Sequence, residues 1–97
     1  MDGHYPEFPI VPGAILVELA VEAAFRAAPA AADTCTRLSV ESARFLAPVR
    51  PHDIVSFTTD VRAGEDGDTV VRVTGKLADE TLCCRTRIRI SKTKAVL

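Results

Sequence analysis

The pattern of apolar and polar positions divides the chain into one helical segment followed by four extended segments. From Gly13 to about Ala28 the side chains are apolar almost all the way round, which predicts a helix that is covered on most of its sides. Proline suits the first turn of a helix, so Pro12 or Gly13 opens it, and Pro29 ends it. The segment 28–34 is expected to be a connector.

The rest of the chain shows the two-residue alternation and the turn signals of β-strands. The four expected strands lie within 36–49, 53–63, 69–78 and 81–91. The expected turns lie at 50–53, 64–68 and 79–80. The last strand alternates apolar residues with arginines, which places the adjacent Cys83 and Cys84 on opposite faces. One helix followed by four antiparallel strands predicts an α+β domain with the helix on one sheet face.

Composition fits a single small domain over residues 1–97, with 47% hydrophobic and 26% charged residues. No run of 18 apolar residues free of charge is present, so we expect no membrane span. The first residues lack the basic and apolar regions of a signal peptide, and we expect a cytoplasmic protein. A net charge of −1 argues against a nucleic-acid partner.

The three cysteines have no spacing typical of a metal site. In a cytoplasmic protein they are expected to be reduced thiols that fill apolar space. We therefore expect neither a metal nor a cofactor.

The candidate chemistry lies in the first eighteen residues. Three prolines within residues 4–12 make a stiff, extended loop, which suits holding the side chain of His4 still. Gly13 begins the helix, where free N–H groups favour a developing negative charge. Glu18 follows in the apolar helix, so a base, an acid and an oxyanion donor occur close together. Two plainer interpretations stay open: Glu18 belongs to a solvated stripe with Glu22 and Arg26, and His4 lies in a mobile tail.

The stretch "GHYPEFPIVPGAILVE", residues 3–18, closely resembles the signature of the hot-dog-fold 3-hydroxyacyl-ACP dehydratases of the FabZ type. That signature reads roughly Gly-His-Phe/Tyr-Pro-Gly-x-Pro-x-x-Pro-Gly-Val-Leu-x-x-Glu. A weaker likeness is "ARFLAPVRPHD", residues 43–53, against a family strand and turn of the form Arg-Phe-x-x-Pro-Val-x-Pro-Gly-Asp. The resemblance covers nearly the whole chain and implies a hot-dog fold, with a long central helix packed on an antiparallel sheet.

The resemblance also implies roles for particular residues. His4 falls on the catalytic histidine and Glu18 on the catalytic glutamate, while Gly13 falls on the glycine whose N–H meets the thioester carbonyl. Val11 and Pro12, beside Gly13, are expected to contact substrate. The implied activity is dehydration of a (3R)-3-hydroxyacyl-ACP to the trans-2-enoyl-ACP in fatty-acid or polyketide biosynthesis. A neutral histidine suits a base near pH 7, and apolar surroundings would keep Glu18 protonated as the acid.

Three departures separate the chain from the family pattern. Glu7 stands where the family usually has glycine, and Glu22 stands where glutamine is usual. The family carries a helix and one or two strands before the histidine, whereas three residues precede His4 here. We therefore expect a truncated, four-stranded sheet with an open edge. The alternatives are a non-catalytic or half-site hot-dog subunit that pairs with another dehydratase chain, and a hot-dog acyl thioesterase.

The expected partners are a second hot-dog chain and an acyl carrier protein. A small chain with one apolar helix cannot cover that helix alone, so we expect a homodimer or heterodimer joined through the strand at Arg37–Phe45. The family's site lies at that interface, with His4 and Glu18 from different chains. The segment from Arg85 to Lys94 is basic and has no acids, and with Arg44 and Arg50 it forms the candidate surface for the acidic carrier protein. The arginines expected to carry it are Arg44, Arg50, Arg87 and Arg89. The alternative for these arginines is a solvated strand face.

Overall fold

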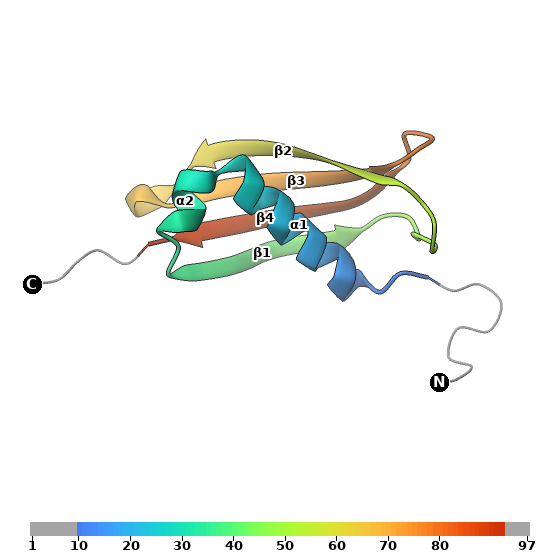
Figure 1. Cartoon of the computed structure of the whole chain (residues 1–97), viewed down its shortest axis with the longest axis horizontal. Coiled ribbons are helices and arrows are strands. Elements are labelled where there is room, and N and C mark those ends of the chain that lie inside the picture. The colour runs from blue at the N-terminus through green and yellow to red at the C-terminus, as the bar shows by residue number, and fades with distance from the viewer. Residues whose placement is uncertain (1–9, 93–97) are drawn as a thin grey trace, which may run out of the picture.

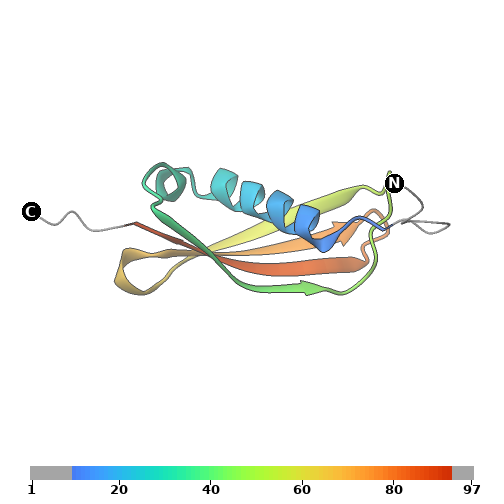
Figure 2. The same ribbon diagram turned by 90° about the horizontal axis from the view of Figure 1, so that it is seen from below.

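The computed structural model describes residues 10–92 as a single antiparallel sheet with helices on one face (Figures 1 and 2). The helices are α1 (Gly13–Ala27), α2 (Pro29–Asp33) and the 3₁₀ turn η1 (Glu65–Gly67). The strands are β1 (Arg37–Phe45), β2 (Val55–Ala63), β3 (Thr69–Leu77) and β4 (Leu82–Ser91), in the spatial order β1-β4-β3-β2. The expected α+β architecture, a hot-dog arrangement with one long helix packed on four antiparallel strands, is confirmed.

The helix α1 begins at Gly13 as predicted, but the expected connector after it is wrong. Residues Pro29–Asp33 form the short helix α2 instead. Pro29 occupies its first turn, where the fixed φ of proline favours a helix, and the alanines that follow have the highest helix propensity. The backbone N–H of Ala32 donates to the carbonyl of Ala28 at 2.9 Å, and this hydrogen bond closes the first turn of α2.

The helix α1 is covered on one side only, which differs from the expectation of cover on most sides. Leu16, Ala20 and Ala24 are buried against the sheet, at intervals of four residues that place them on one face. Ile15 and Leu19 on the outer side are 46% and 42% exposed. The physical reason is that the chain supplies one sheet face and no further layer in residues 10–92.

The strand β4 lies inside the sheet, paired with β1 on one side and β3 on the other. Its expected alternation is confirmed, since Thr86, Ile88 and Ile90 are buried while Arg85 and Arg87 are exposed.

The placement of Cys83 and Cys84 on opposite faces is wrong, because both are buried in the same core cluster, together with Leu16 and Val49. The register shifts there: Gly75 pairs with Cys84 and Lys76 with Leu82, so Cys83 is an extra, bulged residue. Gly75 makes room opposite the bulge, because a Cβ at that position would lie 2.6 Å from the Cys84 sulfur.

The edge strand β1 has little cover on its inner face. The helix α1 packs against β2, β3 and β4 and crosses the sheet diagonally (Figure 1). Leu38, Val40 and Phe45 of β1 consequently stay 39%, 42% and 49% exposed. The side chains of Leu38 and Val40 stand opposite the buried Ile90 and Ile88, so they continue the core surface to an uncovered margin.

The turn at 50–53 forms as expected, and it explains a detail of the resemblance. The N–H of Asp53 donates to the carbonyl of Arg50 at 3.0 Å, and the N–H of Arg50 donates to the Asp53 carboxylate at 2.8 Å. His52 between them has φ of 76°. The resembled family turn carries glycine at this place, the residue that adopts positive φ without steric cost.

The buried thiol of Cys84 makes stability fall in alkaline solution. Burial, and next the adjacent Cys83, raise the pKa of Cys84 from its ordinary value near 9 to about 11. The folded protein therefore keeps a proton that the unfolded chain releases, and the contribution of this thiol is complete below about pH 8.5 and lost as pH rises toward 11. Urea unfolding at pH 7.5, 9 and 10 should show the decline. Cys84→Ala should flatten it, and an equal slope in the variant would contradict the assignment.

Candidate active site

The structure tests the expected site from Ile10 onward, because His4 and Glu7 lie outside the described residues. Val11, Pro12 and Gly13 lead into the first turn of α1, and Glu18 follows in its second turn. The elements that position them are therefore the start of α1 and whatever packs against it.

The two sequence motifs fold against each other at the start of α1. The N–H of Val11 donates to the carbonyl of Val49 at 2.7 Å, and Val49 is buried at 3% exposure. The N–H of Leu46 donates to the carbonyl of the bulged Cys83 at 2.8 Å. The chain before the helix is thus tied to the chain after β1, and that segment is tied to β4 in the middle of the sheet.

Gly13 is required by a close contact with the ring of Phe45. A Cβ at Gly13 would lie 2.8 Å from the nearest ring carbon, closer than real Cβ contacts allow. Next to this contact lies a hollow of about 330 Å³. Apolar residues of both motifs line most of it: Ile10, Val11, Leu16, Phe45, Leu46, Ala47, Pro48 and Val49. The hollow suits an apolar group placed beside the helix start.

The helix start offers backbone donors. Pro12 is the N-cap, its carbonyl accepts from the N–H groups of Ile15 and Leu16 at 3.1 and 3.4 Å, and no side chain caps the helix. Within residues 10–92 no acceptor is found for the N–H of Gly13 or of Ala14. Such groups, at the positive end of the helix dipole, can stabilise an oxyanion.

Glu18 is exposed on the side of α1 that faces away from the sheet. Its apolar neighbours on the helix, Ile15 and Leu19, do not shield it from water, because they are themselves nearly half exposed. The single chain therefore does not bury Glu18. The neighbouring Glu22 pairs with Arg26 at 2.8 Å, as the solvated-stripe interpretation expected for those two residues. Glu18 itself has no ion pair in the described part of the chain.

A second hollow, which sequence reasoning missed, lies between α1 and the edge strand β2. It measures about 440 Å³, and Leu19, Phe57 and Thr59 contribute to its walls together with the Glu22–Arg26 pair. The only signal for it in the sequence was the alternation that places Phe57 and Thr59 on one face of β2.

The arginines expected to bind a carrier protein do not share one environment. Arg44, Arg87 and Arg89 lie on the strands β1 and β4, and Arg50 lies in the turn after Val49. Arg50 and Arg44 have no carboxylate partner in residues 10–92.

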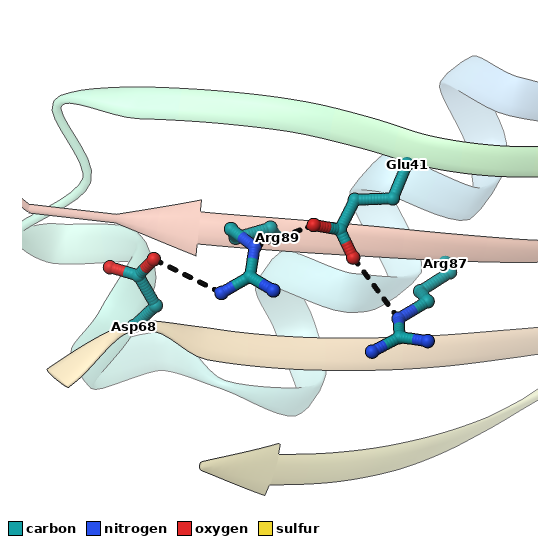
Figure 3. A network of polar contacts seen from close by, with 4 residues as sticks. All are labelled: Glu41, Asp68, Arg87 and Arg89. Atoms are coloured by element: carbon teal, nitrogen blue, oxygen red, sulfur yellow. Dashed lines mark hydrogen bonds and ion pairs between the residues drawn. The ribbon is translucent and has the colours of Figure 1, made fainter. Parts of the chain in front are cut away.

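Arg87 and Arg89 are held by carboxylates that the sequence pattern did not reveal. One oxygen of Glu41 contacts Arg87 at 3.0 Å and the other contacts Arg89 at 2.6 Å, while Asp68 contacts Arg89 at 3.2 Å (Figure 3). The hydrogen bond from Arg89 lowers the pKa of Glu41, and the positive charges of Arg89 and Arg87 lower it further. Desolvation of the carboxylate opposes this effect but is smaller than the hydrogen bond. Glu41 is far from both arginines in sequence, and it reaches them because it bulges from β1 beside β4.

The described residues 10–92 also bear on metal binding and on membrane insertion. No group of three or more histidine, cysteine or carboxylate side chains is arranged there to hold a metal ion. No helix in that range combines the length and apolarity needed to cross a membrane.

Comparison with known proteins places these features in context. The model of the ApeI-like family, described as ApeI dehydratase, matches residues 1–87, a range that includes His4 and Glu18. A protein of Ruminiclostridium cellulolyticum named 3-hydroxyacyl-[acyl-carrier-protein] dehydratase FabZ is 30% identical over 97 residues, covering 96% of this chain and 68% of that protein. A protein of the same name from Allorhizobium ampelinum is 41% identical over 59 residues, covering 57% of this chain and 38% of that protein.

The exposure of Glu18 predicts that it contributes little to the stability of the chain. Glu18→Gln should change the free energy of unfolding by no more than about 0.5 kcal/mol, the usual range for surface substitutions. Glu41→Gln, the same chemical change, should cost more because Arg87 and Arg89 lose their shared partner. Urea unfolding of both variants at pH 7 measures the difference, and a larger loss for Glu18→Gln would show that Glu18 has a structural partner.

Proposed function

The chain belongs to the ApeI-like dehydratase family, and from that premise we propose that it removes water from a 3-hydroxyacyl thioester carried by an acyl carrier protein. The observation that carries the proposal is the way the two motifs meet: Val11 is bonded to Val49, and Gly13 packs on Phe45. This contact sets an uncapped helix start beside an apolar hollow, the combination that an acyl thioester requires.

In this proposal each group has one task in the elimination. Neutral His4 takes a proton from C2, and the N–H of Gly13 stabilises the negative charge that develops on the thioester oxygen. Glu18 gives a proton to the hydroxyl that leaves C3 as water, so the carboxyl must be protonated when the substrate binds. Val11 and Pro12 hold the thioester end, and the hollow beside Phe45 receives the apolar group next to it.

The proposed site needs a second hot-dog chain. A carboxyl stays protonated near neutral pH only where water is excluded, yet Glu18 is exposed in the single chain. The apolar residues that flank it, Ile15 and Leu19, are partly exposed. On the edge strand β1, Leu38 and Val40 are partly exposed as well. Pairing of β1 with its counterpart would cover Leu38 and Val40, and the family resemblance implies that it would also set Glu18 of one chain against the histidine loop of the other. The second chain is either another copy or a related dehydratase subunit.

A second candidate function is supported by the same exposure. If this chain supplies only structure or half of a site to a catalytic partner, the open margin at β1 is explained equally well. The thioesterase alternative has less support, because it would use a carboxylate and a water molecule and would leave the His4 motif without a task.

The catalytic pair can be tested by two single variants. Glu18→Gln keeps the shape but cannot donate the proton, and His4→Ala removes the base. Each should lower the dehydration rate by about 10²- to 10⁴-fold, the usual scale for losing a general acid or base. The double variant should be little worse than either single, because both groups act in one step. Mass spectrometry of a 3-hydroxyacyl carrier protein, before and after incubation, measures the loss of water.

Mixing the two inactive variants provides the control for the shared site. If His4 and Glu18 come from different chains, mixed dimers hold one intact site, so part of the activity should return. Light scattering on the same samples reports whether dimers are present. Glu18→Gln protein that turns over at the parent rate would end this mechanism, and an inactive wild-type chain that becomes active only with a related subunit would favour the half-site function.

The carrier protein is proposed to approach the basic surface that includes Arg44, Arg50, Arg87 and Arg89. Arg50 provides the cleanest test, because its side chain has no carboxylate partner within residues 10–92 that a substitution would disturb. Arg50→Glu should lower kcat/KM for a carrier-bound substrate by roughly 3- to 10-fold at low salt, and added salt should reduce the difference. The same acyl group on a small thiol, free of carrier, is the control. An equal loss on both substrates would place Arg50 in the catalytic site instead of the docking surface.

A further inference from the structure

The sheet face without helices carries a compact arginine cluster, formed by Arg44 on β1, Arg72 on β3, and Arg85 and Arg87 on β4 (Figure 2 shows the bare face). Arg44 stands directly opposite Arg85 in the strand register, and Arg72 stands directly opposite Arg87. Like charges in directly opposite positions destabilise a sheet. Two such pairs side by side therefore cost stability unless an anion lies between them.

Carboxylates do not neutralise the arginine cluster. Only Arg87 has an ion pair, with Glu41 at 3.0 Å, among the cluster residues described. The carboxylate that stands opposite Arg72 is Asp60, which instead bonds Arg62 at 2.9 Å. Arg89 two residues further along β4 has two carboxylate partners, so the deficit is local to the cluster.

The arginine cluster surrounds a hollow of about 640 Å³ that is completed by the side chains of Ser42 and Thr74. Register fixes its pattern: Arg44, Arg85 and Thr74 form one row across three strands, and Ser42, Arg87 and Arg72 form the next. Strand spacing makes this grid about 10 Å wide and about 7 Å long. No exposed apolar side chain lines the hollow, so it offers nothing to an acyl chain or a membrane.

We propose that this hollow binds a small ligand with two linked phosphoryl groups. Arginine presents a planar fork of donors that matches phosphate oxygens two at a time, and three of the four guanidinium groups here have no ion-pair partner in residues 10–92. The hydroxyls of Ser42 and Thr74 add donors at opposite corners of the grid. The width of the grid suits a diphosphate, since each of its phosphoryl groups can reach a different arginine pair. The site lies on the opposite face of the sheet from α1 and shares Arg44 and Arg87 with the proposed carrier surface, but its argument does not use the proposed dehydration chemistry.

Titration calorimetry with sodium pyrophosphate in a low-salt buffer tests the site directly. Wild-type protein should bind it, and Arg72→Gln and Arg85→Gln should each weaken the affinity by at least about 10-fold. Arg26→Gln on α1 makes the same change of charge on the other side of the molecule and should leave the affinity within about twofold, since its partner Glu22 is exposed. Sulfate at equal ionic strength should bind more weakly than pyrophosphate.

Thermal unfolding gives a second readout, because the Tm of a protein with a merely solvated face would not respond to pyrophosphate. Without ligand, Arg85→Gln should raise Tm by about 1–5 °C, because it removes the like-charge pair with Arg44. With pyrophosphate, wild-type Tm should rise and the variant should not respond. Absence of binding at millimolar pyrophosphate, or an equal loss in Arg26→Gln, would overturn the proposal. So would weaker binding of an acidic carrier protein by Arg85→Gln if the wild-type protein binds no pyrophosphate, since the cluster would then serve only the proposed carrier docking.

Discussion

One helix has to cover a four-stranded sheet, and this shortage of apolar cover governs the rest of the structure. Alanines at positions 20 and 24 are buried, which lets α1 lie close to β3 and β4, and its diagonal course extends that cover to β2. Little cover remains for β1: the start of α1 contacts Phe45 through Gly13, but Leu38, Val40 and Phe45 stay partly exposed. Glu18, on the side of α1 that faces away from the sheet, is exposed as well. In the proposed mechanism Glu18 must be shielded from water, and the inner face of β1 also lacks cover; a second chain is proposed to supply both.

The other sheet face meets solvent through charge instead of apolar packing. Arg87 and Arg89 share Glu41, and Asp68 completes the pairing of Arg89 (Figure 3). Pairs with this exposure add little stability one by one, but they show which charges the fold satisfies internally. Formal charge along the sequence did not distinguish these arginines from Arg44, Arg72 and Arg85, which the fold leaves without carboxylates in the described range. The contrast is visible only once the strand register is known.

Sequence patterns predicted most of the fold because each pattern has a local cause. Proline at 12 and at 29 marks helix boundaries through its fixed φ, and alternation marks the strands. The short helix α2 was missed because a proline ends one helix and begins another with equal ease. The two cysteines were misplaced because a bulge depends on pairing between strands, which alternation within one strand does not contain. For the same reason the partners of Arg89 were beyond the sequence. The solvated-stripe interpretation anticipated the exposure of Glu18, and the motif around Gly13 predicted the helix start that the structure contains.

The bulge at Cys83 links the centre of the sheet to the candidate site. At the extra residue in β4, two consecutive side chains, those of Cys83 and Cys84, are buried in the core. The Cys83 carbonyl leaves the strand pairing and accepts hydrogen bonds from the N–H groups of Leu46 and Ala47 at 2.8 and 3.4 Å. That segment in turn leads to Val49, whose carbonyl accepts from Val11 before the helix. The chain that enters α1 is therefore positioned by backbone hydrogen bonds that begin in the middle strand pair. Opposite the bulge the chain needs a residue without a side chain, because a Cβ at Gly75 would lie 2.6 Å from the Cys84 sulfur. The bulge at the two adjacent cysteines thus helps to position the chain that enters α1, through the backbone hydrogen bonds of Cys83. The raised pKa of Cys84 keeps its side chain a neutral thiol.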